Sequence, residues 1–206
     1  MPGEVAGPLR YVALGDSYTI GTAVAEAERW PDQLVAALGG AAGPLGLVAN
    51  LAVNGFTTSD VIAVQLPRLD GLRPGFVTLL IGVNDVVQGV PDETYRTQLD
   101  AIFDHLIRRL PPARIVAVTT PDYTLTPAGA DYGDPEERRA GILRANETMG
   151  KVAASQGVAV VDIFDLSRRA ATDRSLVAAD GLHPSAAQYA LWVERIVPVV
   201  RVLLAR

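Results

Sequence analysis

Two short segments, one near each end of the chain, carry side chains that could act together as a nucleophile and its base. Gly15-Asp16-Ser17-Tyr18 contains a serine, and Asp180-Gly181-Leu182-His183 contains one of the two histidines in the sequence. A serine hydroxyl is a weak nucleophile until a neighbouring base accepts its proton, and a histidine oriented by a carboxylate can be that base. We therefore predict Ser17 as the nucleophile, His183 as its base and Asp180 as the residue that orients the imidazole.

The composition excludes several other kinds of chemistry. The 206 residues contain no cysteine, which rules out disulfides and thiolate nucleophiles and, with two histidines, argues against a metal site. We expect neither a metal nor another cofactor. The net charge of −5 argues against a nucleic-acid partner, because such partners require many positive charges to neutralise phosphates. The length fits a single domain spanning residues 1–206.

The sequence also bears on location. The first residues show neither the basic start nor the apolar run of a secretory signal, and no apolar stretch is long enough to cross a bilayer. We expect a soluble cytoplasmic protein without an integral membrane segment; a sequence trimmed of its leader would instead belong to a secreted protein. The residues indicate no oligomeric state.

Apolar segments alternate with amphipathic ones along the whole chain, which predicts strands separated by helices. The predicted strands are residues 9–14, 47–52, 76–81, 114–119 and 158–163. The predicted helices are residues 29–38, 61–66 after a cap at Thr58-Ser59-Asp60, 92–109, 136–155 and 185–204, the last interrupted at Pro198. The pattern favours an α/β fold: a five-stranded parallel sheet between two layers of helices. By analogy we expect a flavodoxin-like strand order.

In open parallel sheets, ligands bind beyond the carboxyl ends of the strands. Ser17 follows the first predicted strand, Gly55 the second and Asn84 the third, whereas His183 comes after the fifth. With a flavodoxin-like order, the first three strands are neighbours, so we expect Gly55, Ser17 and Asn84 along one rim. The irregular segment 120–135 should emerge beside this rim, where it could act as a lid.

Four segments, in this order, resemble the signature blocks of the SGNH hydrolases, the GDSL-type esterases and lipases. They are Gly15-Asp16-Ser17-Tyr18, Gly55, Gly82-Val83-Asn84-Asp85 and Asp180-Gly181-Leu182-His183, and they span nearly the whole chain. Tyr18 stands where the GDSL name has leucine, a departure that concerns pocket shape. The resemblance implies an SGNH hydrolase fold and hydrolysis of an acyl ester through an acyl-serine intermediate.

The resemblance also implies an oxyanion hole. It consists of the backbone N–H groups of Ser17 and Gly55 and the side-chain amide of Asn84. Such donors stabilise the charge that develops on the carbonyl oxygen in the transition state. Asp16 and Asp85, which belong to the same blocks, are expected to hold local backbone structure. Substrates served by the family include short acyl esters, O-acetyl sugars, lysophospholipids and acyl thioesters; our working hypothesis is a short to medium acyl ester.

Other interpretations remain open at the level of sequence. Each motif taken alone also fits an ordinary turn or helix cap. Ser17-Tyr18-Thr19-Ile20-Gly21-Thr22 could instead cradle the phosphate of a flavin or nucleotide at a helix start, although this leaves Asn84 and His183 unexplained. A catalytically silent binding module is a third possibility. His105 belongs to no motif and is predicted to lie on a helix face.

Overall fold

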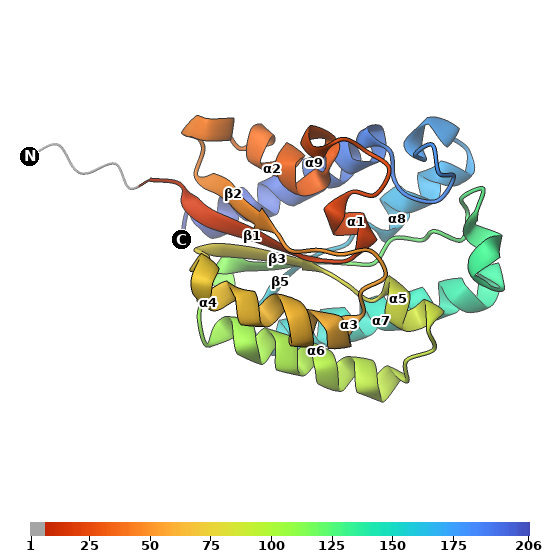
Figure 1. The fold of residues 1–206 in the computed structure, drawn as a ribbon, viewed down its shortest axis with the longest axis horizontal. Helices are drawn as coiled ribbons and strands as arrows, with labels where there is room; N and C mark the ends of the chain where they lie inside the picture. Colours follow the sequence, from red (N-terminus) through yellow and green to blue (C-terminus); the bar gives the residue numbers. More distant parts are fainter. Residues whose placement is uncertain (1–6) are drawn as a thin grey trace, which may run out of the picture.

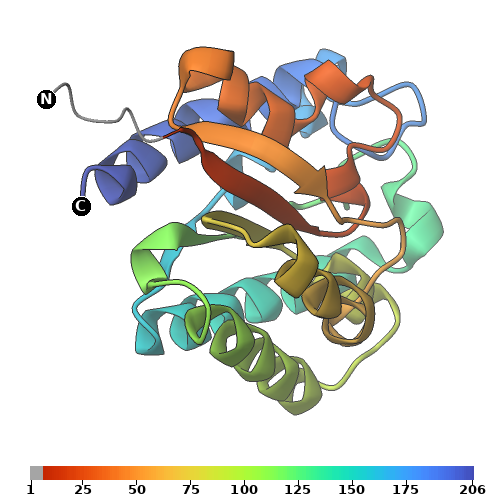
Figure 2. The ribbon, with the colours of Figure 1, turned by 60° about the vertical axis from the view of Figure 1, so that its left-hand side comes forward.

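A five-stranded parallel sheet forms the centre of the molecule. The computed structural model describes residues 7–206. The strands lie in the order β2-β1-β3-β4-β5, and the arrowheads of β2 and β1 point to the same side in Figure 2. This is the flavodoxin-like order, and it confirms the predicted α/β architecture. The strands are β1 (Leu9–Gly15), β2 (Leu45–Asn50), β3 (Phe76–Leu80), β4 (Ile115–Val118) and β5 (Ala159–Val161).

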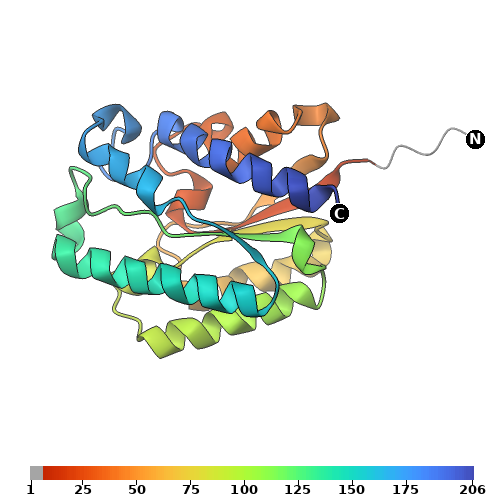
Figure 3. The same ribbon diagram turned by 180° about the vertical axis from the view of Figure 1, so that it is seen from behind.

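Helices cover both faces of the sheet, and Figures 1 and 3 show the two layers from opposite sides. One layer contains α1 (Ser17–Ile20), α2 (Trp30–Ala37), α8 (Phe164–Ser167) and α9 (Ala186–Leu204). The other contains α3 (Thr58–Asp60), α4 (Leu69–Leu72), α6 (Asp92–Ile107) and α7 (Pro135–Ser155), with α5 (Val83–Val87) beside them at the carboxyl end of β3. No helix within residues 7–206 is long and apolar enough to cross a membrane.

The inner strand β1 is buried on both faces from its third residue to its carboxyl end. Tyr11 and Ala13 belong to the core on the α2/α9 side, whereas Val12 and Leu14 belong to the core on the α6/α7 side. All four residues are completely buried. Successive side chains of a strand point to opposite faces, so a strand covered on both faces must be apolar at every position. The apolarity of residues 11–14 therefore follows from their place between two neighbouring strands and two helical layers.

The last helix differs from the prediction. We expected an interruption at Pro198, but α9 runs continuously from Ala186 to Leu204 with the proline inside it. Proline removes one backbone hydrogen bond from a helix interior. In α9, Ile196 and Val200 on either side of Pro198 are completely buried against the sheet, and Ser185 caps the helix start. Tertiary packing of this apolar face outweighs the local penalty.

Gln65 holds the carboxyl end of β1 in place. Its fully buried amide accepts a hydrogen bond from the N–H of Gly15 at 3.0 Å and donates one to the Gly15 carbonyl at 2.7 Å. Gln65 is the last residue of a π-helical turn, Val61–Gln65, just after α3. The Gln65 amide thus makes the two backbone hydrogen bonds that a neighbouring strand would make with Gly15, two residues before Ser17.

We expect Gln65→Leu to lower the free energy of unfolding by about 1–3 kcal/mol, because the buried N–H of Gly15 loses its acceptor. Urea unfolding monitored by circular dichroism measures the change. Val64→Thr is the matched control, since Val64 lies in the same turn and is 46% exposed; it should shift stability by less than about 0.5 kcal/mol. Equal stability of Gln65→Leu and the wild type would contradict this role.

Candidate active site

Ser17 lies at the sharp junction between β1 and α1. Gly15, the last residue of the strand, has φ +151°, and a Cβ on it would come within 2.3 Å of the Leu80 carbonyl oxygen. A residue with a side chain therefore cannot replace it without displacing β3. Asp16 follows as the helix N-cap, and its carboxyl accepts a hydrogen bond from the Tyr18 N–H at 3.0 Å. This arrangement makes Ser17 the first residue of α1, as a largely buried side chain at the pocket wall.

Asn84 and Asp85 connect α5 to the loop that contains Gly55. The Asn84 side-chain amide donates to the Phe56 carbonyl at 2.9 Å. The adjacent Asp85, which is buried, accepts hydrogen bonds from the Thr58 N–H at 3.1 Å and from the Thr58 hydroxyl at 2.5 Å. An asparagine amide has two N–H donors, so Asn84 keeps one for a ligand. These contacts fix the two predicted oxyanion donors relative to each other.

Gly55 itself has φ +81°, a left-handed conformation that side chains rarely adopt. No atom lies within 4 Å of the position that a Cβ would occupy there. The requirement for glycine therefore comes from the backbone conformation of the loop, because the space around it is open.

Asp180 and His183 form a compact turn. One carboxylate oxygen of Asp180 accepts hydrogen bonds from the N–H groups of Leu182 and His183, each at 3.0 Å. The other oxygen lies 2.6 Å from Nδ1 of the His183 ring. Partial burial raises the pKa of Asp180, but these hydrogen bonds outweigh it and hold the pKa below its ordinary value. Asp180 is therefore ionised at neutral pH. Because it contacts only Nδ1 of the ring, Nε2 of His183 is available to a nucleophile.

The segment that carries His183 is closed into a rigid loop ahead of α9. Val177 and Pro184 form an antiparallel bridge, and the Ala178 N–H donates to the His183 carbonyl at 2.8 Å. Ser185 then caps the helix by accepting from the Gln188 N–H. His183 thus lies three residues before α9, on a loop with few backbone degrees of freedom.

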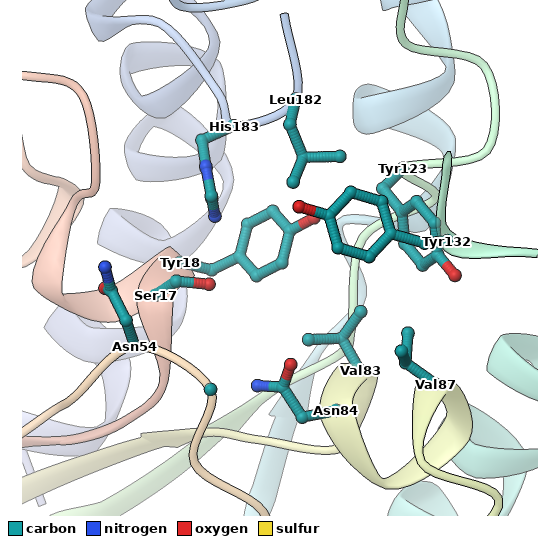
Figure 4. A pocket seen from close by; sticks show the side chains of 11 residues that line it. Ser17, Tyr18, Asn54, Val83, Asn84, Val87, Tyr123, Tyr132, Leu182 and His183 are labelled. Carbon is teal, nitrogen blue, oxygen red and sulfur yellow. The ribbon is translucent and has the colours of Figure 1, made fainter. Parts of the chain in front are cut away.

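The predicted residues Ser17, Gly55, Asn84 and His183 line one pocket of about 250 Å³ at the carboxyl end of the sheet. Asp180 does not line it and reaches the site through its contact with His183. Figure 4 shows the unbonded nitrogen of the His183 ring pointing toward the Ser17 hydroxyl, with Asn84 on the opposite side of the pocket. The structure therefore brings together residues from both ends of the chain. The eleven lining residues are Ser17, Tyr18, Asn54, Gly55, Val83, Asn84, Val87, Tyr123, Tyr132, Leu182 and His183.

The sequence connects Tyr18 with pocket shape and assigns no role to Val83 and Leu182, which also line the pocket. The ring of Tyr18 packs against His183, with 5.3 Å between ring centroids, and against Trp192 at 6.5 Å. Tyr18 therefore packs against the His183 ring and also lines the pocket. Val83 and Leu182 each precede a predicted site residue, so their position beside the motifs is the signal that could have identified them.

His105 lies away from this pocket, as its lack of a motif suggested. It is a half-buried residue of α6, and the pocket lining does not include it. Burial, together with the nearby Arg109 and Arg108, lowers its pKa. Within residues 7–206, no group of three or more His, Asp or Glu side chains is arranged to hold a metal ion.

The segment 120–135, predicted to emerge beside the rim, contributes Tyr123 and Tyr132 to the pocket. Its first part is firmly attached: Asp122 is 1% exposed and its carboxylate pairs with Arg139 at 3.2 Å. Further along, the Ala128 N–H donates to the Gly181 carbonyl at 2.9 Å. The segment is therefore a wall of the pocket joined to the His183 loop, and a lid motion stays a prediction.

Asp16 carries a carboxyl group in an unusual state. The residue is completely buried, and one of its carboxyl oxygens has no hydrogen-bond partner in the described part of the chain. Burial raises its pKa to about 8, against the lowering effect of the Tyr18 N–H, and the nearby Asp85 carboxylate raises it further. Asp16 is therefore mostly neutral at pH 7, so no full negative charge lies behind Ser17.

The chain is similar in sequence to one known family and in fold to several solved structures. Residues 13–191 match the GDSL-like Lipase/Acylhydrolase family. An acetylxylan esterase from Geobacillus stearothermophilus is 18% identical, with a TM-score of 0.73 and 95% of each chain covered. A lipolytic G-D-S-L family protein from Veillonella parvula is 17% identical, with a TM-score of 0.73 and 93% of this chain and 98% of that chain covered.

A third solved structure, TesA, is 20% identical, with a TM-score of 0.71 and 94% of this chain and 99% of that chain covered. At these identities the likeness establishes the fold. No curated protein matches the chain.

The buried carboxyl of Asp16 predicts a pH-dependent stability. Its pKa rises on folding from an ordinary 3.8 to about 8, so the native state holds a proton that the unfolded state releases. This contribution to stability is complete below about pH 4 and is lost as the pH rises toward 8. We expect Asp16→Asn, which imitates the neutral form, to lose less stability than the wild type between pH 5 and pH 8. Urea unfolding at both pH values measures this.

Asp131→Asn serves as the control, because Asp131 is exposed and should follow the wild-type pH dependence. If Asp16→Asn loses as much stability as the wild type over this range, Asp16 is ionised in the native protein and the assignment is wrong.

Proposed function

Because the chain belongs to the GDSL-like lipase/acylhydrolase family, we propose that it is a carboxylic ester hydrolase that cleaves short to medium acyl esters through an acyl-enzyme on Ser17. The observation that carries the proposal is the grouping of Ser17, Asn84 and the Asp180–His183 pair around one pocket. Family membership favours this function over the flavin- or phosphate-binding alternative. The pocket's polar groups also suit an ester, because they combine a base with hydrogen-bond donors.

In the proposed reaction the Ser17 oxygen attacks the ester carbonyl carbon while the free ring nitrogen of His183 takes its proton. The carbonyl oxygen becomes an oxyanion, which accepts hydrogen bonds from the Ser17 and Gly55 N–H groups and from the Asn84 amide. The tetrahedral intermediate then expels the alcohol, which takes the proton from His183. Water attacks the acyl-enzyme with His183 again as base, and this step releases the acid and restores Ser17.

Two carboxyl groups have opposite charge states in this scheme. Asp180, with its lowered pKa, is ionised and stabilises the positive charge that forms on the His183 ring. Asp16, with its raised pKa, is mostly neutral at pH 7 and therefore does not repel the oxyanion that forms beside Ser17. The reaction needs no metal or cofactor, because base, orienting carboxylate and oxyanion donors are all side chains or backbone groups.

The alternatives within the family differ in the group attached to the acyl carbon. Acyl thioesters, lysophospholipids and O-acetyl carbohydrates undergo the same attack on a carbonyl. An acetylxylan esterase has the same fold, which keeps acetylated carbohydrates as a second candidate substrate class. Esters of one chromophoric alcohol with different acyl chains test the ester hydrolysis itself, independently of which natural leaving group the enzyme accepts.

We expect hydrolysis of p-nitrophenyl esters to depend on Ser17 and His183. Ser17→Ala and His183→Ala should each lower kcat by at least about 10⁴-fold, measured by release of p-nitrophenolate at saturating ester. His105→Ala is the matched control, because His105 does not line the pocket, and it should keep wild-type activity. Equal activity of Ser17→Ala and the wild type, or loss of activity only in His105→Ala, would refute the assignments.

Asn84→Ala tests the oxyanion hole separately. Loss of one preorganised donor should reduce kcat by about 100-fold or more while the KM changes little. Because the Asn84 amide also bonds to the Phe56 carbonyl, the melting temperature of the Asn84→Ala variant should be measured in parallel. Near-normal turnover in a folded Asn84→Ala variant would remove Asn84 from the proposed mechanism.

A further inference from the structure

The attack geometry leaves a single side of the pocket for the acyl chain. The tetrahedral carbon carries four substituents: the Ser17 oxygen, the oxyanion, the leaving oxygen and the acyl chain. The oxyanion faces Asn84, and the leaving oxygen must lie near His183 to receive its proton. In Figure 4 these two residues lie on opposite sides of the pocket, with Ser17 to one flank. The acyl chain is therefore directed to the remaining flank, away from Ser17.

That flank is apolar and uncharged. It is lined by Val83 and Val87 from α5, by Leu182 from the His183 loop, and by Tyr123 and Tyr132 from segment 120–135. Among the described residues that line the pocket, there is no Asp, Glu, Lys or Arg. A charged acyl group would lose its hydration there without gaining a partner. The flank consequently suits a neutral, apolar acyl chain.

Tyr132 closes the outer end of this flank. The residue lines the pocket and is 43% exposed, so it contacts both the pocket and solvent. Figure 4 shows its ring beside that of Tyr123 at the edge of the pocket. The ring also packs edge-on against Tyr123, which is 3% exposed, with centroids 6.0 Å apart and planes at 78°. Tyr132 is thus a thin wall between the pocket and water.

Arg138 holds this wall at a set distance from α5. Its Nε donates to the Tyr132 carbonyl at 2.9 Å, and its Nη1 donates to the Val86 carbonyl at 2.8 Å. The guanidinium therefore bridges the two walls of the flank, with Val83 and Val87 on one side and Tyr132 on the other. Gly133 makes room for it, since a Cβ there would lie 2.5 Å from Nε. These hydrogen bonds of Arg138 fix the distance between α5 and Tyr132, and with it the width of the flank.

We propose that Tyr132, positioned by Arg138, ends the acyl site and restricts the enzyme to short, neutral acyl chains. This inference rests on the proposed ester hydrolysis. The pocket, at about 250 Å³, is smaller than the roughly 300–1,000 Å³ typical of sites for larger ligands. It must hold the reacting ester as well as the chain. Removal of the ring opens the flank to solvent, so that a longer chain can pass through.

The test compares kcat/KM for p-nitrophenyl esters from acetate to decanoate. Tyr132→Ala is expected to raise the ratio of octanoate to acetate hydrolysis by about tenfold or more. Tyr132→Phe, which keeps the ring, should keep the wild-type ratio. Arg138→Met, which frees the wall but keeps its ring, should raise the ratio by a smaller factor. Asp131→Ala, an exposed neighbour on the same segment, is the control and should keep the wild-type profile.

Two outcomes would overturn the inference while the proposed function stands. One is Ser17-dependent hydrolysis with the same chain-length profile in Tyr132→Ala and the wild type, in variants whose melting temperatures show them folded. The other is a change confined to the alcohol, measured with acetate esters of alcohols of increasing length, which would place the leaving group on this flank. Absence of Ser17-dependent hydrolysis in the wild type would instead refute the proposed function itself.

Discussion

The parallel pairing of β1 with both β2 and β3 is the constraint on which the site depends. Parallel neighbours end at the same edge of a sheet, and the register sets Gly15 opposite Leu80. Ser17 and Asn84, which follow these two residues by two and four positions, must then emerge side by side. The chain after β2 adds Gly55 at the same edge, with the Val53 N–H bonded to the Gly15 carbonyl. The relative positions of these three residues thus follow from backbone pairing within the sheet.

Buried polar groups turn this edge into a rigid frame. Gln65, Asp85 and Asp122 are each 2% exposed or less, and each accepts a hydrogen bond from the backbone where a strand, helix or loop approaches the pocket. Burying such groups is unfavourable unless their hydrogen bonds are satisfied. Once satisfied, they fix loops that would otherwise sample many conformations. Donors held in place before the substrate arrives need not reorganise when charge develops, which is the physical advantage of such a frame.

The pocket has two parts with different structural origins. The side with Ser17, Gly55 and Asn84 comes from strand ends, whose positions the sheet determines. The opposite flank includes segment 120–135, whose path depends on individual contacts such as those of Arg138. Proteins that share this fold at about one-fifth identity can therefore share the first part and differ in the second. For this reason a likeness of fold establishes the arrangement of the strands but not the substrate.

The sequence by itself determined the strands, the strand ends that bear polar motifs and the family, which the match over residues 13–191 confirms. These features depend on local patterns: apolar runs, turn residues and four short motifs. It did not determine the path of α9, where Pro198 suggested a break that core packing overrides. Nor did it reveal that Gln65 holds Gly15, that Tyr18 packs on His183, or that Arg138 joins α5 to Tyr132. Partners in these contacts lie up to 165 residues apart, and no local pattern records which distant residue a side chain will meet. Only the tertiary structure decides such contacts, because they form when the sheet and its two helical layers have already brought remote segments together.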